Sequence, residues 1–310
     1  MLKNNVICLM GPTASGKTAQ ADELVQRFPM EIISIDSAMI YREMNIGTAK
    51  PDAELLARAP HHLIDILDPP ETYSAAQCCE DVTALCQAIF NRGNVPLLVG
   101  GTMMYFNALQ KGLSLLPEAN EAIRQSILQQ ANEHGWASMH QQLTNIDPVS
   151  AHRINPHDTQ RIQRALEVYA ITKTPLSVLC DVPKAPSSLQ FTNLVILPDS
   201  RKALHARIET RFKHMLADGF IQEVEALLKK WSLTAAHSSM RSVGYRQIIS
   251  YLQGEYDYET LYEKATAATR QLAKRQLTWL RNWPEKIVFQ PTEASIADDK
   301  MMAVVQQVLK

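Results

Sequence analysis

The sequence lacks the cysteine and apolar patterns that mark zinc-binding, secreted or membrane-spanning proteins. Its five cysteines form no C-x-x-C pair and have no histidine at zinc-finger spacing, so we expect reduced thiols. No apolar run approaches the roughly 20 residues of a membrane helix. The start, "MLKNNVICLMG", has no long apolar segment and no cleavage site of a secretory signal. These absences predict a soluble, cytoplasmic protein with no membrane partner.

The chain also lacks a strong charge bias. Its formal net charge is −1 and its pI is about 6.8, so only local clusters can indicate a polyanionic partner. Hydrophobic residues make up 46% and charged residues 20% of the 310, an ordinary globular balance. This length allows one large domain, or one domain with a smaller companion.

One stretch has a specific chemical meaning. "GPTASGKT" matches the phosphate-binding pattern G-x-x-x-x-G-K-[ST], with Gly11, Gly16, Lys17 and Thr18 at the fixed positions. An apolar run, "NVICLM", precedes it and a helical pattern, "TAQADELVQRF", follows. This context predicts a phosphate site in which Lys17 reaches an outer phosphate and Thr18 holds Mg²⁺.

The remaining strand patterns predict an α/β fold with a parallel sheet. "EIISID", "VPLLVGGT" and "NLVILP" alternate with helical segments, as in a parallel sheet covered on both faces. Strand patterns disappear between residues 113 and 190, where the segments are helical and polar on one side. We therefore expect a catalytic domain made of residues 1–112 and 191–310, interrupted by an all-helical insertion at 113–190.

Two motifs that usually accompany the phosphate loop in nucleotide hydrolases are missing from the sequence. Hydrolases usually add an apolar strand that ends in a Mg²⁺-binding aspartate, but "VPLLV" ends in Gly100-Gly101. The only such strand with an acid at its end is "IISID", which ends at Asp36. No Asn-Lys pair exists for the N-K-x-D motif of a GTPase. The loop is therefore present without the usual hydrolytic groups.

Asp36 follows a strand, as do Gly11 and Gly100, so the three should meet at one edge of the sheet. The residue types leave three roles open for Asp36: a general base, a Mg²⁺ ligand or a helix cap. Thr102 fits a structural role in a turn at least as well as a role in the site. Further polar or small residues expected around this edge are Ser37, Tyr41, Gly47, Thr48, Lys50 and Tyr105.

Three basic clusters indicate a polyanionic partner. They are Arg161 with Arg164, then Arg241, Tyr245 and Arg246 around Gly244, and the acid-free run from Lys264 to Arg281, in which Trp279 is interleaved. For each cluster alone, a solvated positive face is an equally simple explanation. Arg207 and Arg211 lie four residues apart on a predicted helix. They would either close over phosphates or pair with nearby acids.

The motifs in combination resemble the bacterial tRNA dimethylallyltransferase family, which prenylates adenosine 37 of tRNA. The matching segments are "GPTASGKT", "DSAMIYREMNIGTAKP", "LLVGGTMMYF", "QRIQRALEVY", "RSVGYRQ" and "RQLAKRQLTWLR". The resemblance runs from about Val6 to Trp283. It implies a kinase-like sheet domain with a helical insertion, and a channel that admits the prenyl donor at one end and a flipped-out adenine at the other.

The resemblance also implies site residues. Asp36 matches the base, assisted by Thr102 and Lys17. The residues implied for the diphosphate of dimethylallyl diphosphate are Gly11, Pro12, Thr13, Ala14, Ser15, Gly16, Lys17, Thr18 and Arg211, with Thr18 on Mg²⁺. The residues implied for tRNA are Asp36, Ser37, Ala38, Met39, Thr102, Gln160, Arg161, Ile162, Gln163, Arg164, Arg241, Ser242, Val243, Gly244, Tyr245, Arg246, Lys274, Arg275, Gln276, Leu277, Thr278, Trp279, Leu280 and Arg281.

Two other functions use the same loop. A small-molecule or nucleoside kinase would need ATP and ignore tRNA, and the basic C-terminal helices argue against it. A non-catalytic RNA-binding NTP switch would need the base-reading and strand-end acids that the sequence lacks. We therefore expect a dimethylallyl transferase that uses Mg²⁺, takes the anticodon stem-loop of tRNA and dimethylallyl diphosphate as partners, and is a monomer.

Overall fold

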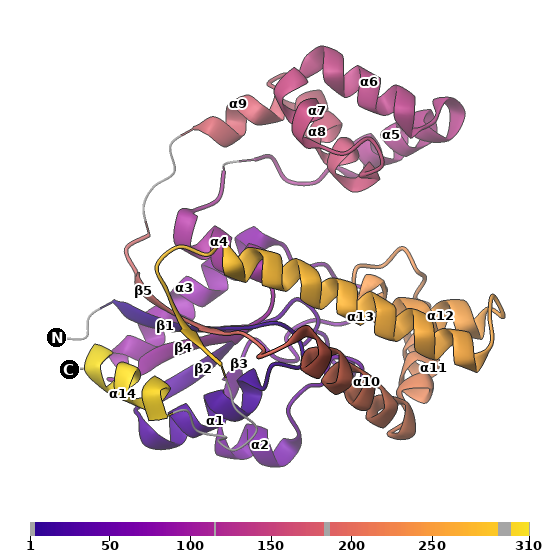
Figure 1. Ribbon diagram of the computed structural model, residues 1–310. Helices are drawn as coiled ribbons and strands as arrows, with labels where there is room; N and C mark the ends of the chain where they lie inside the picture. The colour runs from indigo at the N-terminus through magenta and orange to yellow at the C-terminus, as the bar shows by residue number, and fades with distance from the viewer. Residues whose placement is uncertain (1–3, 115, 183–186, 291–298, 310) are drawn as a thin grey trace. The chain divides into compact units, whose positions relative to one another are not determined.

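The computed structural model describes residues 4–114, 116–182, 187–290 and 299–309. The chain divides into two compact units (Figure 1). The first combines Met1–Gln110 with Ser187–Lys310, and the second is Lys111–Pro186. The sequence-based boundaries, 113 and 190, differ from these by two and four residues.

The first unit is built on a sheet in which all strand pairs are parallel. The six strands lie in the order β3-β2-β4-β1-β5-β6. Their bounds are β1 Asn5–Met10, β2 Met30–Ile35, β3 His61–His62, β4 Val95–Gly100, β5 Gln190–Ile196 and β6 Lys286–Phe289. The sequence predicted the four inner strands. It missed β3 and β6, which lie at the edges and, at two and four residues, are too short for a clear apolar pattern.

Helices cover both faces of this sheet, as the continuous apolar strands require. On one face Val6, Cys8 and Met10 of β1 pack with α3 (Ala75–Asn91) and α4 (Met103–Lys111). On the other, Ile7 and Leu9 pack with α1 (Lys17–Arg27) and α14 (Asp299–Val308). The alternation follows from the two-residue period of a strand. Because β1 lies between β4 and β5, the β1–α1 loop is near the middle of the sheet edge.

A helical group continues this unit beyond the carboxyl edge of the sheet. Its elements are α2 (Ala53–Arg58), α10 (Arg201–Ala217), α11 (Phe220–Trp231), the 3₁₀ turn Ser239–Arg241, α12 (Tyr245–Leu252) and α13 (Tyr258–Arg281). Helices α10 and α11 are separated at Gly219, whose φ of 98° lies in the left-handed region that favours glycine. Phe212, Phe220 and Tyr245 form the centre of a separate apolar core with the segment after β2.

The second unit is helical throughout its described residues. Its helices are α5 Glu121–His134, α6 Trp136–Ile146, α7 Pro148–Arg153, α8 Thr159–Thr172 and α9 Leu176–Asp181. Leu143 and Ile162 lie in its apolar core. The side chain of Glu167 is fully buried, and it accepts hydrogen bonds from Arg124, Arg164 and the backbone N–H of Asn120. A buried carboxylate needs such partners.

Within the described ranges, no helix is long and apolar enough to cross a membrane. The five cysteines are free.

Candidate active site

The phosphate-binding loop joins the central strand β1 to α1. Gly16 precedes the helix with a φ of 88°, and neither a side-chain cap nor an acidic residue occupies the first turn of α1. The first N–H groups of the helix are therefore available to an anion, to which the helix dipole adds. A Cβ atom on Gly11 would come within 2.7 Å of Ser15 Oγ. The buried hydroxyl of Ser15 has no protein partner.

Lys17 begins α1 and folds back over the loop. Its Nζ donates to the carbonyl oxygen of Pro12 at 2.8 Å. Desolvation lowers the pKa of Lys17 from 10.5 to about 8; the charge of Asp36 opposes this shift and that of Arg211 adds to it. The three charged groups therefore lie within electrostatic reach of one another.

Helix α10 adds two arginines to this loop. Nη2 of Arg211 donates to Thr13 Oγ1 at 2.5 Å. Burial lowers the pKa of the Arg211 guanidinium, and the charge of Asp36 opposes this shift. Arg207 lines the same cavity, with Nε and Nη2 buried and without a partner. Among the described residues neither arginine forms an ion pair, so the predicted pairing with nearby acids is not found, and a bound anion would satisfy both.

Asp36 caps the turn that follows β2. Its Oδ1 accepts from the backbone N–H groups of Ala38 at 2.8 Å and Met39 at 3.3 Å. Among the described residues no helix begins directly after Asp36, so in place of the helix cap that the sequence left open the structure has a cap on a turn. Because Oδ1 makes both bonds, Oδ2 is left for a base or metal-ligand role.

Thr102 lies beside this turn, at the end of β4. Its Oγ1 accepts from the N–H of Ser37 at 3.1 Å and is 3.4 Å from the Ser37 hydroxyl. Its own N–H donates to the carbonyl of Ile35 at 3.3 Å. Thr102 thus ties the ends of β2 and β4 together and holds Ser37, the neighbour of Asp36.

Gln276 of α13 clamps the other side of the site. Its Oε1 accepts from the N–H of Thr13, and its Nε2 donates to the carbonyl of Gly101, both at 2.9 Å. A Cβ atom on Gly101 would come within 2.5 Å of this amide nitrogen. Gln276 was predicted as a tRNA residue, and the structure places its amide between the phosphate loop and the end of β4.

These groups line one cavity of about 830 Å³. The phosphate loop, Asp36 and Thr102 meet there with Arg207 and Arg211. The lining also contains apolar side chains, which include Met39, Ile208, Phe212, Met215 and Phe220. The cavity therefore offers a cationic end for a diphosphate and an apolar wall for a hydrocarbon.

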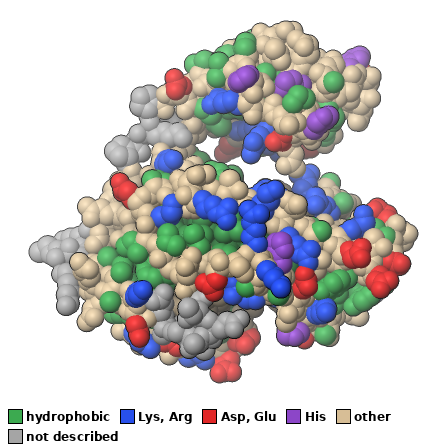
Figure 2. Space-filling model, viewed as in Figure 1, with side chains coloured by type: hydrophobic (Ala, Val, Ile, Leu, Met, Phe, Trp, Pro, Cys, Tyr) green, Lys and Arg blue, Asp and Glu red, His purple; other side chains and the backbone are tan. Residues whose placement is uncertain are grey.

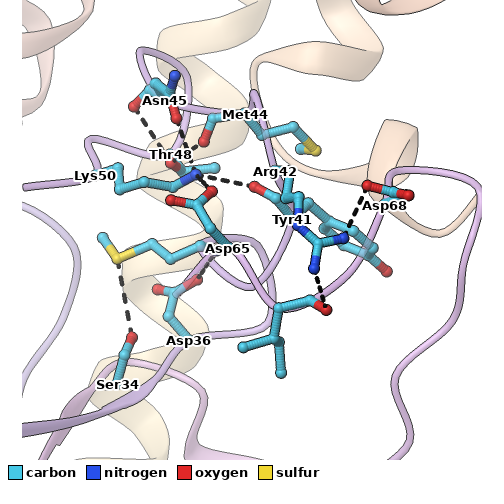
Figure 3. Close-up of polar contacts among 12 residues, drawn as sticks. Ser34, Asp36, Tyr41, Arg42, Met44, Asn45, Thr48, Lys50, Asp65 and Asp68 are labelled. Carbon is cyan, nitrogen blue, oxygen red and sulfur yellow. Dashed lines mark hydrogen bonds and ion pairs between the residues drawn. The ribbon is translucent and has the colours of Figure 1, made fainter. Parts of the chain in front are cut away.

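The segment after β2 is held rigidly by polar contacts (Figure 3). Nζ of Lys50 donates to the carbonyl of Tyr41, to Oδ1 of Asn45 and to Oδ1 of Asp65. The expectation that Lys50, Tyr41 and Tyr105 surround the site was wrong, because none of them lines the cavity. The Tyr41 and Tyr105 hydroxyls instead donate to the backbone carbonyls of Glu71 and Tyr73.

Glu223 of α11 holds the same segment from outside the motif. Its carboxylate accepts from the N–H groups of Asn45, Ile46 and Gly47 and from the hydroxyl of Tyr245, at 2.6–3.1 Å. A Cβ atom on Gly47 would come within 2.1 Å of Phe220, which explains the glycine. Sequence reasoning missed Glu223, since its three backbone partners lie more than 170 positions away.

The tRNA candidates on α13 separate into two groups. Leu277 and Leu280 are buried in the core. The exposed residues of this segment are Lys274, Arg275, Thr278, Trp279 and Arg281. Arg270, four residues before Lys274 and eleven before Arg281, was expected to share a face with these two, and its charge is paired with Glu209. Side chains of Lys and Arg gather over α13 in the view of Figure 2.

The segment 241–246 is likewise divided. Gly244 and Tyr245 are buried, and the Tyr245 ring packs on Phe220 with centroids 4.9 Å apart. Arg241 and Arg246 are exposed. Arg241, Ser242 and Val243 line the cavity. This segment therefore contributes one face to the site and one to the core.

In the helical insertion, only part of the segment 160–164 is exposed. Gln160 and Arg161 are exposed, and Ile162 is fully buried. Gln163 donates to the carbonyl of Arg124. Arg164 is bound to Glu167 and to the carbonyl of Pro117, both at 2.7 Å. Arg164 therefore stabilises its own unit. Gln160 and Arg161 are exposed, and Nε of Arg161 lies 3.4 Å from Oδ2 of Asp158.

The residues present also fit a magnesium ion. Mg²⁺ keeps several waters and is commonly held by one or two protein groups together with substrate phosphates. Thr18 and Asp36 line the cavity beside the phosphate loop. No group of three or more His, Cys, Asp or Glu ligands occurs in the part of the chain that was described. A donor set this small suits an ion that arrives with a diphosphate.

Comparisons with known proteins agree with this geometry. A family model described as IPP transferase matches residues 39–283, and one described as isopentenyl transferase matches residues 4–65. A tRNA dimethylallyltransferase from Legionella pneumophila (strain Paris) is 57% identical over 304 residues, which cover 98% of this chain and 97% of that protein.

Solved structures show the same fold. The tRNA isopentenylpyrophosphate transferase from Bacillus halodurans superposes with a TM-score of 0.72 at 34% identity, over 99% of this chain and 96% of that one. A eukaryotic dimethylallyltransferase described as acting on tRNA gives a TM-score of 0.82 at 24% identity, over 99% and 80%. Sequence, fold and site thus lead to one conclusion: the chain belongs to the IPP transferase family.

Proposed function

We propose that this protein transfers the dimethylallyl group of dimethylallyl diphosphate to N6 of adenosine 37 in the anticodon loop of tRNA. The cavity carries this proposal, because it joins a cationic phosphate site to an apolar wall and to Asp36. The Legionella pneumophila relative, which is 57% identical, is named tRNA dimethylallyltransferase. A kinase would use the loop for ATP, and the family assignment favours the prenyl transfer over that alternative.

In the reaction, a bond forms between N6 of adenine and C1 of the dimethylallyl group while the bond from C1 to the diphosphate oxygen breaks. The electron pair of the broken bond leaves with the diphosphate. The N–H groups of the loop, Lys17, Arg207 and Arg211 surround this position and stabilise the charge that develops there. Mg²⁺, held by Thr18 with or without Asp36, would neutralise part of the same charge.

Asp36 accepts the proton that N6 loses. Its Oδ1 is fixed by the turn at Ala38 and Met39, which leaves Oδ2 for this proton. Thr102 orients the turn through Ser37. A positioned base of this kind contributes about 10²–10⁴-fold to a rate. The apolar wall excludes water from the allylic carbon as positive charge develops on it.

The tRNA would be held by exposed basic side chains on both units. These are Arg161 of the insertion, Arg241 and Arg246 near α12, and Lys274, Arg275 and Arg281 of α13. A phosphate backbone binds such groups through charge and counterion release. The reacting base must leave its stack to reach the cavity.

One assay tests the proposal. The protein is incubated with unmodified tRNA, Mg²⁺, ATP and dimethylallyl diphosphate labelled in the prenyl group. Label in adenosine 37, together with one diphosphate released per prenyl group, is the expected result. Consumption of ATP without transfer of label would overturn the proposal in favour of a kinase. A tRNA with guanosine at position 37 is the matched control.

A further inference from the structure

A second hollow, separate from the cavity, lies between α10 and α13. Its volume is about 340 Å³. We call it the outer groove. The basic residues that line it are Arg201, His205, Arg270, Lys274 and Arg281, and its apolar residues include Leu204 and Leu277. None of its α10 residues was predicted to bind a substrate.

The charge of the outer groove is not compensated by the protein. Among the described residues, no carboxylate pairs with Arg201, Lys274 or Arg281, and Glu209 pairs with Arg270 alone. Nε of Arg270 is buried and has no partner. The buried Nε of Arg270 needs an acceptor, and the three exposed cations, which water solvates in the free protein, add positive charge that attracts an anion. A phosphate group meets this requirement.

Helix α13 forms a wall of both hollows. Arg275, Gln276 and Trp279 line the cavity, whereas Lys274, Thr278 and Arg281 line the outer groove. The two sets lie on different faces of a helix about 10 Å across. A nucleic acid strand with one base in the cavity therefore reaches the outer groove within a few nucleotides.

We infer that the outer groove binds a backbone phosphate and the adjoining sugar of the tRNA, outside the reacting nucleotide. In this arrangement Arg201 and His205 of α10 bind the phosphate together with Lys274 and Arg281. The apolar floor at Leu204 and Leu277 accepts the sugar. The inference rests on the proposed function, since it takes tRNA as the substrate, and it extends the tRNA surface from α13 onto α10.

Arg201→Ala tests this inference, with Lys202→Ala as the matched control. Lys202 is the next residue of α10, is exposed and does not line the groove. The dissociation constant of tRNA is measured for both variants from 0.05 to 0.3 M salt. We expect Arg201→Ala to weaken binding roughly 5–10-fold, as one charge-assisted contact would. The slope of log K against log salt should fall in magnitude by about 0.7–0.9, while Lys202→Ala leaves both unchanged.

Three results would overturn the inference. One is an Arg201→Ala variant with the affinity and salt slope of the wild type. Another is an equal effect of Lys202→Ala, which would show a diffuse surface charge. A third is a rise in the KM of dimethylallyl diphosphate without a change in tRNA affinity, which would assign the groove to a free diphosphate. Binding is measured without catalysis, so an enzyme that fails to transfer the prenyl label would refute the proposed function separately.

Discussion

Nη2 of Arg211 lies 2.5 Å from Oγ1 of Thr13, across 198 positions of sequence. This contact joins α10 to the phosphate loop and completes a cationic site that the loop alone does not form. Arg207, one turn earlier on the same helix, adds buried donors without partners to the cavity. The proposed diphosphate site is therefore formed by two elements that only the folded chain brings together.

Arg211→Ala should reduce kcat/KM for dimethylallyl diphosphate by about 10–100-fold, the value of a hydrogen bond to a charged group. Arg211→Lys should restore part of this loss, because it keeps the charge but not the planar donor pair. Steady-state kinetics at saturating tRNA provide the measurement. Lys213→Ala, an exposed change on the same helix, serves as the control. Unchanged kinetics in Arg211→Ala would remove this residue from the diphosphate site.

The substitution Asp36→Asn distinguishes the proposed base role of Asp36 from its role as a cap of the turn. Asparagine keeps an Oδ1 that can accept from Ala38 and Met39, but it cannot take the N6 proton. We expect turnover to fall about 10²–10⁴-fold while the melting temperature stays unchanged. Asp36→Ala should lose the cap as well, at a cost of about 1 kcal/mol in unfolding free energy.

The Asp36→Asn result also distinguishes the base from a metal ligand. A loss of turnover that persists at all Mg²⁺ concentrations agrees with a base. A loss that high Mg²⁺ reverses would assign Asp36 to the metal. Full activity of Asp36→Asn would refute both roles.

The lowered pKa of Lys17 predicts weaker diphosphate binding at alkaline pH. In the free protein Lys17 loses its charge as the pH rises through about 8, and the bound anion favours the charged form. The dissociation constant of inorganic diphosphate should therefore rise by up to about tenfold per pH unit above 8. Calorimetry without Mg²⁺ at pH 7, 8 and 9 measures it, and Lys17→Met should bind weakly with little dependence on pH.

The same pKa shift has the opposite effect on the stability of the unliganded protein. The unfolded chain binds more protons at Lys17 than the folded chain between pH 8 and 10.5. The contribution of this group to stability therefore rises with pH across that window. In the calorimetry experiment, an affinity for inorganic diphosphate that stays constant from pH 7 to 9 would contradict the assignment of Lys17 to the anion site.

Glu223 should be essential for the loop after β2 although it lies outside every motif. Glu223→Gln replaces one of the two acceptor oxygens with an NH₂ donor, so at least one of the N–H groups of Asn45, Ile46 and Gly47 loses its acceptor. Leaving such donors unsatisfied costs about 2–4 kcal/mol in unfolding free energy. Denaturant titration measures the loss. Glu225→Gln, an exposed change on the same helix, should be neutral, and equal stability of the two variants would show that Glu223 does not hold the loop.

Much of the candidate site at the carboxyl edge of the sheet could be predicted, because the sequence patterns that indicate it are local. The apolar run, glycine spacing and helical period around Lys17 lie within about 20 consecutive residues, a span over which backbone propensities act. The position of Asp36 beside Gly100 followed from one rule, that parallel strands end at a common edge. The resemblance to the family depended on the same short segments.

The remaining features depended on residues that are distant in the sequence. The edge strands β3 and β6 are too short to show a pattern. The clamp of Gln276, the acceptor Glu223 and the pairing of Arg270 with Glu209 each join positions more than 60 apart. The sequence by itself therefore determined which chemical groups are present and where the phosphate loop lies. The tertiary structure alone decided which cations face an anion and which are neutralised, because hydrogen bonds and ion pairs depend on distance in space, not along the chain.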